Sequence, residues 1–346
     1  MTLSELNVVA RQMMSFAYAE TTKRSLNSQQ KSFVEFCELH SLSDWPAKPD
    51  TLVVYAAHLI QSGRIKSRSS IRQYLSAVRT LHKMFGRECV TPSTYGPLDL
   101  IVKGIDRGFT EPSKTRLPIT VQILSNLVFG LNNYITHVNL EAKSFGLAMK
   151  SLYLTLFSTM LRGGNCLPDS QSDFNSVRHL SWGRIEVVDQ GLVVRIPMSK
   201  TIQLGDRVHE IPIARCAVQQ MCPVLALLDL VNLRGVDKCQ DSVSVFTYLK
   251  NGSWVILTKA VAGKFLAGQL TAMGLNAKLY GLHSFRVGSI MQGLEGNNSM
   301  AFLRLHSDHR SSAIYGYLHM PAVRRFGVAC SLSRDVASAA MAIGLS

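Results

Sequence analysis

The chain has 346 residues, 47% of them hydrophobic, so it can bury a sizeable core in about two domains, which argues against wholesale disorder. Its formal net charge of +14 is spread along the chain. A folded protein this basic usually binds a polyanion, most often nucleic acid. A basic enzyme with another kind of substrate is the alternative interpretation. The scattered cysteines form no C-x-x-C pair and no apolar run reaches bilayer length, so we expect reduced thiols, no structural zinc site and no membrane contact.

Residues 1–108 are predicted to form a helical domain. Apolar stripes predict helices over residues 8–18, 25–40, 51–62, 70–85 and 97–107, and Asp50 is expected to cap the third of them. The fourth helix and the serine-rich loop before it carry a group of cations: Arg64, Lys66, Arg68, Arg72, Arg79 and Lys83. Such a face suits the phosphate backbone of DNA, and a merely solvated charged face is an equally good interpretation from this region alone.

A polar stretch with two prolines, residues 109–118, is predicted to link this domain to a second one over residues 119–346. Thr120 is the expected cap of the first helix there. A strongly apolar helix over residues 144–160 then leads to Arg162 and two glycines. Because an arginine is rarely buried without an anion or an acid beside it, Arg162 is a candidate site residue.

From residue 182 the pattern changes to short strands, over residues 182–188, 192–197 and 208–213, which predict a small antiparallel meander. Lys200 falls at the second hairpin. A lysine at a hairpin tip is usually solvated, but it could also reach into a neighbouring site as a mobile cation. Further helices are expected over residues 224–232, 258–273, 283–294 and 299–305, with an extended piece at 245–248.

The stretch from residue 281 to 318 carries the densest set of reactive side chains. His283 and Arg286 form an H-x-x-R pair, which a helix would place on one face, and His306 and Tyr315 follow. A guanidinium can hold two non-bridging phosphate oxygens while an imidazole moves a proton near neutral pH. Tyrosine has a pKa of about 10, so it attacks as a nucleophile only beside cations or a base. Each of these residues could instead be purely structural.

The order of these features resembles the tyrosine recombinases, the phage-integrase family. That family places a histidine or tryptophan nine residues before its nucleophilic tyrosine, as His306 precedes Tyr315 here. In the same way Arg162 matches the first family arginine, Lys200 the hairpin lysine, and His283 with Arg286 the H-x-x-R box. The amino-acid sequence between Arg162 and Lys200 is most similar to that of recombinases of eukaryotic mobile elements, in the retrotransposon and crypton-like branches.

Two positions depart from the family pattern. Asn165 stands where many members have an acid that buttresses the active-site cations, so we expect a tuned rather than a lost activity. Leu305 stands where the family has a glycine before the second histidine, so the family pattern does not predict the conformation of this turn. The resemblance implies a mainly α fold with a small antiparallel β-sheet, made of a helical core-binding domain and a catalytic domain.

The resemblance also implies a type IB reaction without metal or cofactor. Tyr315 attacks a DNA phosphodiester and forms a 3′-phosphotyrosine, and Tyr317 is the rival nucleophile. Arg162 and Arg286 hold the phosphate and His306 donates to it, whereas Lys200 protonates the leaving 5′ oxygen. His283 assists proton movement at the tyrosine.

The implied partner is double-stranded DNA, clamped by both domains. Recombination joins two duplexes, so a homo-tetramer on DNA is implied, with the segment after Pro321 exchanged between protomers. The nucleus is the expected location, or the nucleoid if the source is prokaryotic. Three alternatives stay open: a type IB topoisomerase, a domesticated inactive DNA-binding protein, and a basic nucleic-acid-binding module whose histidines and tyrosines are structural.

Overall fold

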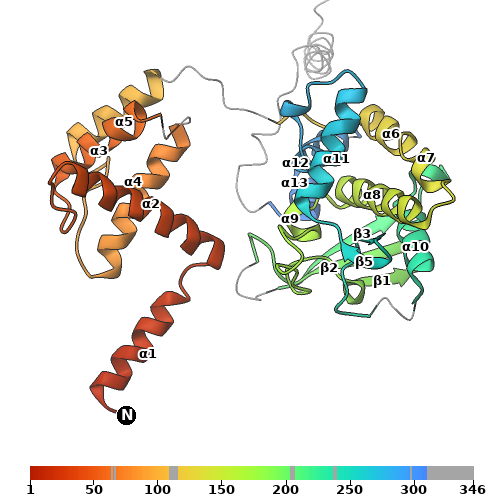
Figure 1. The fold of residues 1–346 in the computed structure, drawn as a ribbon, viewed down its shortest axis with the longest axis horizontal. Helices are drawn as coiled ribbons and strands as arrows, with labels where there is room; N and C mark the ends of the chain where they lie inside the picture. Colours follow the sequence, from red (N-terminus) through yellow and green to blue (C-terminus); the bar gives the residue numbers. More distant parts are fainter. Residues whose placement is uncertain are drawn as a thin grey trace, which may run out of the picture. The chain divides into compact units, whose positions relative to one another are not determined.

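The computed structural model describes residues 1–63, 65, 68–108, 116–202, 207–236, 240–296 and 298–309. The chain divides into two compact units, Met1–Ser113 and Lys114–Ser346 (Figure 1). Helices dominate both units, and small antiparallel sheets occur in the second, which confirms the predicted fold class. Within the described ranges no helix is both long and apolar enough to cross a bilayer. Several predicted site residues lie outside the described residues, namely Arg64, Lys66, Tyr315 and Tyr317, together with the side chain of Arg68.

The first unit is helical, as the apolar stripes predict. Its helices are α1 (Leu3–Ser15), α2 (Glu20–Leu39), α3 (Pro49–Gln61), α4 (Arg68–Met84) and α5 (Gly96–Gly108). The core contains Phe33 and Phe36 of α2, Tyr55 of α3 and Val78 of α4. The rings of Phe33 and Tyr55 meet edge to face with centroids 5.0 Å apart, a favourable aromatic geometry. Burial of these large side chains is what fixes α2, α3 and α4 together.

The start of α3 differs from the prediction. The helix begins at Pro49, and its N-cap is Lys48 rather than Asp50. A proline fits the first turn of a helix because its missing N–H has no partner to lose there. Asp50 instead accepts a hydrogen bond from the hydroxyl of Tyr95.

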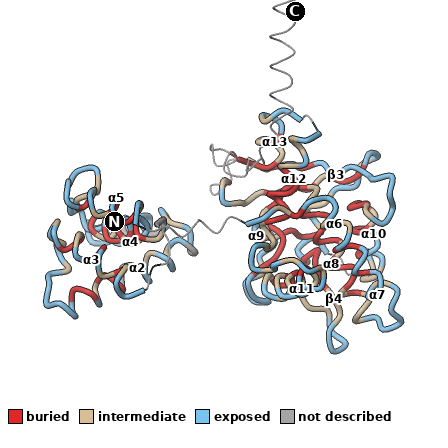
Figure 2. Tube along the Cα trace, turned by 90° about the horizontal axis from the view of Figure 1, so that it is seen from above, coloured by how far each residue is buried: buried red, intermediate tan, exposed pale blue. Residues whose placement is uncertain are grey.

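The second unit is built around one buried helix, α8. Its helices are α6 (Val121–Phe129), α7 (Asn132–Ile135), α8 (Leu140–Thr159), α9 (Gly163–Cys166), α10 (Pro223–Arg234), α11 (Lys259–Ala272), α12 (His283–Glu295) and α13 (Met300–His306). Figure 2 shows α8 as a largely buried helix inside this unit. Thr120 caps α6 as predicted, because its hydroxyl accepts from the N–H of Ile123 at 3.3 Å.

The segment before α6 lies directly against α12. The N–H of Ile119 donates to the carbonyl of Ser284 at 2.9 Å, and the N–H of Leu117 donates to that of Leu279 at 2.8 Å. A Cβ on Gly288 would fall 1.8 Å from the carbonyl oxygen of Ile119, so only glycine allows this approach. The contact fixes the start of the second unit beside the H-x-x-R turn.

The predicted meander is a three-stranded antiparallel sheet in the order β1-β2-β3. Its strands are β1 (Ile185–Val188), β2 (Gly191–Ile196) and β3 (His209–Ala214). In β3, buried and exposed residues alternate strictly, so one face packs on the core and the other meets solvent. A separate hairpin, β4 (Thr247–Lys250) and β5 (Ser253–Ile256), follows α10. Lys200 lies on the connection from β2 to β3.

Candidate active site of the second unit

Arg286, in the first turn of α12, is almost fully buried, with 1% of its surface exposed. Its Nη1 donates to the carbonyl of Met160, just after α8, and its Nη2 donates to that of Ser307, just after α13, at 2.6 Å. Met160 has a left-handed backbone, with φ of +53°, which turns the chain at the end of α8. The guanidinium is therefore held by the ends of two helices that are far apart in sequence.

His309 is the histidine that contacts this guanidinium. Its Nδ1 lies 2.8 Å from Nη2 of Arg286 and its Nε2 lies 3.1 Å from the same atom. Nδ1 is also 2.7 Å from the hydroxyl of Ser307. Burial, and then the charges of neighbouring groups, lowers the pKa of His309 from 6.5 to about 3. The lowering charges are those of Arg286, Arg162 and His283. His309 is thus a neutral imidazole at physiological pH, able to accept from Arg286.

His283 belongs to the same cluster. It is half-buried at the start of α12. Burial is the largest influence that lowers its pKa below 6.5, and three arginines add to it: Arg286, Arg162 and Arg116. Arg162 itself is the N-cap residue of α9, with an extended backbone that follows the turn at Met160. The charges of Arg162 and Arg286 therefore both act on His283, and all three residues are predicted from the sequence.

The side chain of His306 contacts a backbone carbonyl and not the guanidinium of Arg286 in the described hydrogen bonds. Its Nε2 donates to the carbonyl of Ser158 near the end of α8, at 2.9 Å. Its own carbonyl accepts from Nε2 of His209 on β3 at 3.1 Å. The nine-residue spacing to Tyr315 selects His306, whereas the contacts select His309, three residues later. The sequence signal for His309 was its place in the run His-Ser-Asp-His, but spacing alone gave it no role.

The connection that carries Lys200 is tied to both sides of this cluster. Lys200 is exposed, between Ser199 and Thr201, whose hydroxyls both donate to the buried carboxylate of Asp308. On the other side, Nδ2 of Asn165 donates to the carbonyl of Met198 at 3.3 Å. Asn165 stands at the position of the family acid. It is 7% exposed, and its side chain is hydrogen-bonded to the connection between β2 and β3.

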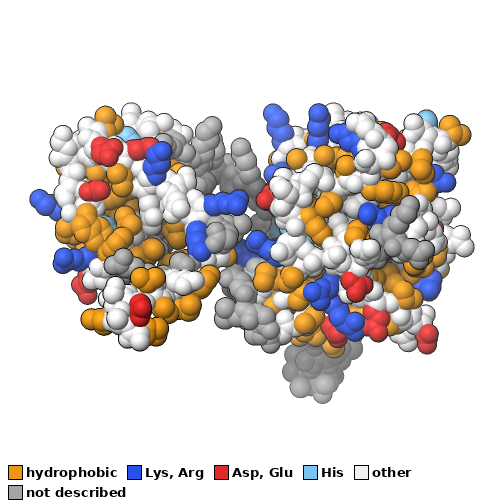
Figure 3. All heavy atoms as spheres, turned by 60° about the horizontal axis from the view of Figure 1, so that its bottom comes forward, with side chains coloured by type: hydrophobic (Ala, Val, Ile, Leu, Met, Phe, Trp, Pro, Cys, Tyr) orange, Lys and Arg blue, Asp and Glu red, His pale blue; other side chains and the backbone are white. Residues whose placement is uncertain are grey.

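The predicted DNA-binding residues of the first unit lie partly within the described range. Arg72 makes a two-point ion pair with Asp106 of α5, with Nη1 of Arg72 at 2.9 Å from Oδ1. Arg79 and Lys83 are exposed on α4. Figure 3 shows lysine and arginine side chains distributed over both units on the face that it draws. Arg79 and Lys83 are thus accessible to a phosphate backbone, and Arg72 is engaged by an acid.

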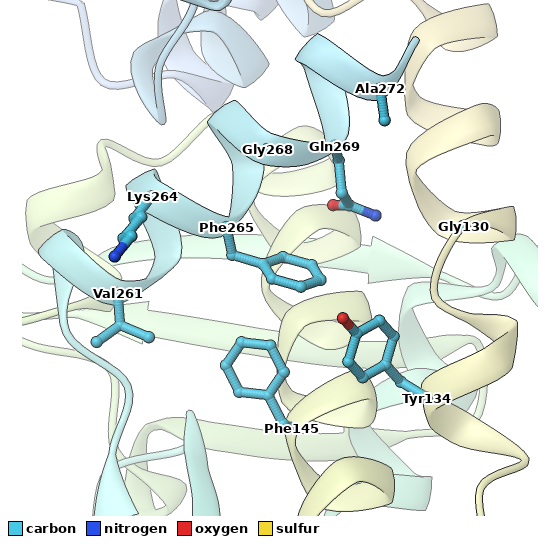
Figure 4. A pocket seen from close by; sticks show the side chains of 9 residues that line it. All are labelled: Gly130, Tyr134, Phe145, Val261, Lys264, Phe265, Gly268, Gln269 and Ala272. Atoms are coloured by element: carbon cyan, nitrogen blue, oxygen red, sulfur yellow. The ribbon is translucent and has the colours of Figure 1, made fainter.

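A separate cavity of about 560 Å³ lies among α7, α8 and α11 (Figure 4). Three aromatic residues are among those that line it, Tyr134, Phe145 and Phe265, and the rings of Tyr134 and Phe145 each meet that of Phe265 nearly perpendicularly. Among the predicted catalytic residues that the structure describes, none lines it. No group of three or more His, Cys, Asp and Glu side chains that could hold a metal occurs within the described residues.

The chain is similar to known recombinases and integrases over most of its length. No protein-family model matches the sequence. A protein described as an integrase/recombinase xerD homolog from Selenomonas ruminantium is 21% identical over 315 residues, which cover 88% of this chain and 83% of that protein.

Solved structures share the fold at low sequence identity. The Tn1549 transposon integrase in complex with transposon right end DNA aligns with a TM-score of 0.61 and 13% identity, covering 95% of this chain and 98% of that one. A λ integrase dimer bound to a core site gives 0.52 and 15%, covering 92% and 95%. XerH recombinase bound to its palindromic substrate gives 0.54 and 13%, covering 82% and 69%. The chain is therefore similar to the tyrosine recombinases and integrases in sequence over most of its length and in fold.

Proposed function

We propose that this protein is a site-specific DNA recombinase that cleaves one strand through Tyr315 and rejoins it to another. The observation that carries the proposal is the buried guanidinium of Arg286, fixed by the ends of α8 and α13 and surrounded by Arg162, His283 and His309. Fixed cations in a partly desolvated site stabilise the charge that builds up on a phosphorane-like transition state without reorganisation. Tyr315 lies six residues after His309 in the sequence.

The chemistry balances without a metal or a nucleotide. The phenolic oxygen of Tyr315 bonds to phosphorus while the bond from phosphorus to the 5′ oxygen breaks. The leaving oxygen takes a proton from Nζ of Lys200, and His283, neutral because of its lowered pKa, accepts the phenolic proton. A 5′-hydroxyl from a second strand then attacks the 3′-phosphotyrosine and restores the free tyrosine.

Two histidines compete for the contact with the phosphate. The nine-residue spacing to Tyr315 assigns this role to His306. The hydrogen bonds between His309 and Arg286 favour His309, because it already lies against the guanidinium that holds the phosphate. The two assignments make different predictions for single substitutions.

The proposed substrate is double-stranded DNA held by both units. In the first unit the phosphate backbone would be bound by Arg72, Arg79 and Lys83, together with Arg64, Lys66 and Arg68. Recombination between two duplexes requires several protomers, and we propose a homo-tetramer in which the segment after Pro321 is exchanged. The λ integrase structure, a dimer on a core site, supports assembly on DNA. We also propose a mobile element of a eukaryotic nucleus as the source of the activity.

The test is covalent trapping followed by strand exchange. The protein, in chelator, is incubated with pooled nicked duplexes of random sequence, and adducts are resolved on a denaturing gel. Adduct formation and joining of strands from two labelled duplexes support a recombinase. Relaxation of supercoiled DNA without exchange between duplexes would assign a topoisomerase instead. Salt-sensitive binding without any adduct would assign an inactive DNA-binding protein, the alternative that Asn165 keeps open.

A further inference from the structure

The carboxylate of Asp308 gathers donors from one short stretch of chain. The hydroxyl of Ser199 lies 3.1 Å from its Oδ2, and the hydroxyl of Thr201 donates to the same atom. Nη2 of Arg207 forms an ion pair with Oδ1. All of these donors lie on the connection between β2 and β3, about a hundred positions earlier in the sequence. Asp308 therefore fastens this connection to the turn that follows α13.

The turn itself is shaped for this contact. Asp308 has a left-handed backbone, with φ of +53°, and is 7% exposed. Aspartate tolerates this conformation better than most residues, and a buried carboxylate is costly unless several donors satisfy it. Its neighbours in sequence are Ser307, whose carbonyl accepts from Arg286, and His309, whose ring contacts Arg286. One turn thus touches the hairpin with Asp308 and the arginine with both flanking residues.

Lys200 stands between the two hydroxyl donors. Ser199 and Ile202 exchange backbone hydrogen bonds of 3.0 and 3.2 Å across it, which closes a tight turn. On the strand side, Nδ2 of Asn165 holds the carbonyl of Met198. The backbone of Lys200 is therefore fixed on both flanks, although its side chain is exposed.

We propose that Asp308 is a positioning residue that holds the Lys200 hairpin in register with the Arg286–His309 cluster, and so aims the general acid at the leaving oxygen. The inference rests on the proposed function. A lysine side chain has many rotamers, so a fixed backbone on both flanks is the main way to raise its local concentration at one oxygen. Releasing the clamp slows proton delivery while the arginines still hold the phosphate.

Asn165 supports the same arrangement. Its amide donates an N–H to a carbonyl, which the carboxylate of an aspartate cannot do, and a carboxylate there would repel that oxygen. The departure of Asn165 from the family acid is thus matched to the hairpin that it holds.

The test compares two leaving groups on the same nicked duplex. In one substrate the scissile bond ends in the usual 5′ oxygen, and in the other in a 5′ sulfur. A thiol has a pKa of about 8.5, far below that of an alcohol, so the thiolate leaves without a proton from a general acid. Adduct formation is timed for the wild type, Lys200→Ala, Asp308→Asn and Thr201→Val. Arg286→Ala and Glu186→Gln are the controls, since Glu186 pairs with Arg195 on the exposed side of the sheet.

We expect Asp308→Asn to slow cleavage of the oxygen substrate by roughly 10- to 100-fold and Thr201→Val to slow it less, as general-acid losses do. With the sulfur substrate both variants, and Lys200→Ala, return to within a few-fold of wild type. Arg286→Ala stays slow on both substrates, and Glu186→Gln matches wild type on both.

Equal slowing of Asp308→Asn on both substrates, or wild-type rates on both, would overturn the proposal. If Asp308→Asn does not fold, Thr201→Val decides by the same comparison, because it removes one donor and leaves the carboxylate partnered by Ser199 and Arg207. A wild-type protein that forms no adduct with either substrate would overturn the proposed function, a result distinct from failure of the Asp308 inference alone.

Discussion

Arg286 donates from Nη2 to the ring of His309, with 2.8 Å between Nη2 and Nδ1. The ring is buried and its pKa is lowered to about 3, so it is neutral and accepts that hydrogen bond. A neutral acceptor orients the guanidinium and leaves its positive charge available to an incoming phosphate. The pair is therefore suited to binding an anion rather than to closing an ion pair.

The first prediction separates the two histidines. Because His309 lies on Arg286 and His306 on the carbonyl of Ser158, we expect His309→Ala to slow cleavage more than His306→Ala does, by about 10-fold or more. Single-turnover adduct formation measures both rates, with DNA binding as the control for folding. A larger loss in His306→Ala would restore the assignment that spacing gives.

The second prediction concerns acid stability. Folded His309 binds a proton only near pH 3, whereas in the unfolded chain it does so near 6.5, so the unfolded state binds more protons between these values. The free energy of unfolding should therefore fall as pH drops from 6.5 toward 3. Arg286, Arg162 and His283 lower the pKa, and Asp308 acts in the opposite direction.

His309→Gln should flatten this pH dependence without removing it, because the pKa values of His179, His209 and His283 are also lowered by burial. Denaturant unfolding between about pH 7.5 and about pH 5 measures the slope. His40→Gln, on the surface of the first unit, is the control. An unchanged slope in His309→Gln would show that this ring is not held neutral by the fold.

The third prediction concerns the missing family acid. Asn165→Asp removes the N–H that the carbonyl of Met198 accepts and places a negative charge against that oxygen. We expect slower cleavage of an ordinary substrate, roughly 10-fold, rather than the gain that restoring an acid would suggest. Faster cleavage by Asn165→Asp would mean that the acid supports the arginines here and that its absence weakens the site.

The fourth prediction concerns stability of the second unit. A Cβ at Gly288 would collide with the carbonyl of Ile119, so Gly288→Ala should lower the free energy of unfolding by about 1–3 kcal/mol or more. Gly263, inside α11, has open space around its Cβ position. Gly263→Ala should instead gain about 0.5–1 kcal/mol from helix propensity. Thermal unfolding of the two variants tests the pair, and equal shifts would contradict the account.

Much of the fold follows from local sequence patterns. Thr120 caps α6 and the apolar run before Arg162 forms α8, because capping and periodicity act over a few residues. The start of α3 was misplaced, since Pro49 takes the first turn and Asp50 bonds to Tyr95, far along the chain. A contact of that kind leaves no local signal.

The residues of the candidate site were likewise predictable where local patterns place them, and not where they depend on distant contacts. His283 and Arg286 lie at the start of the predicted helix over residues 283–294, and Arg162 follows the predicted apolar helix, as the structure shows. The role of His309 depends on its contact with Arg286, 23 residues away, and the contact of Asp308 with Thr201 joins side chains 107 residues apart. Spacing rules describe neither contact.

The most direct measurement is to map the protein residue that becomes joined to DNA. The protein is trapped on pooled nicked duplexes in chelator, digested, and the DNA-linked peptide is sequenced, for the wild type, Tyr315→Phe and Tyr317→Phe. We predict an adduct on Tyr315 that is lost in Tyr315→Phe and kept in Tyr317→Phe. An adduct that survives Tyr315→Phe and disappears in Tyr317→Phe would contradict the assignment of the nucleophile. DNA binding without any adduct would contradict the proposed reaction itself.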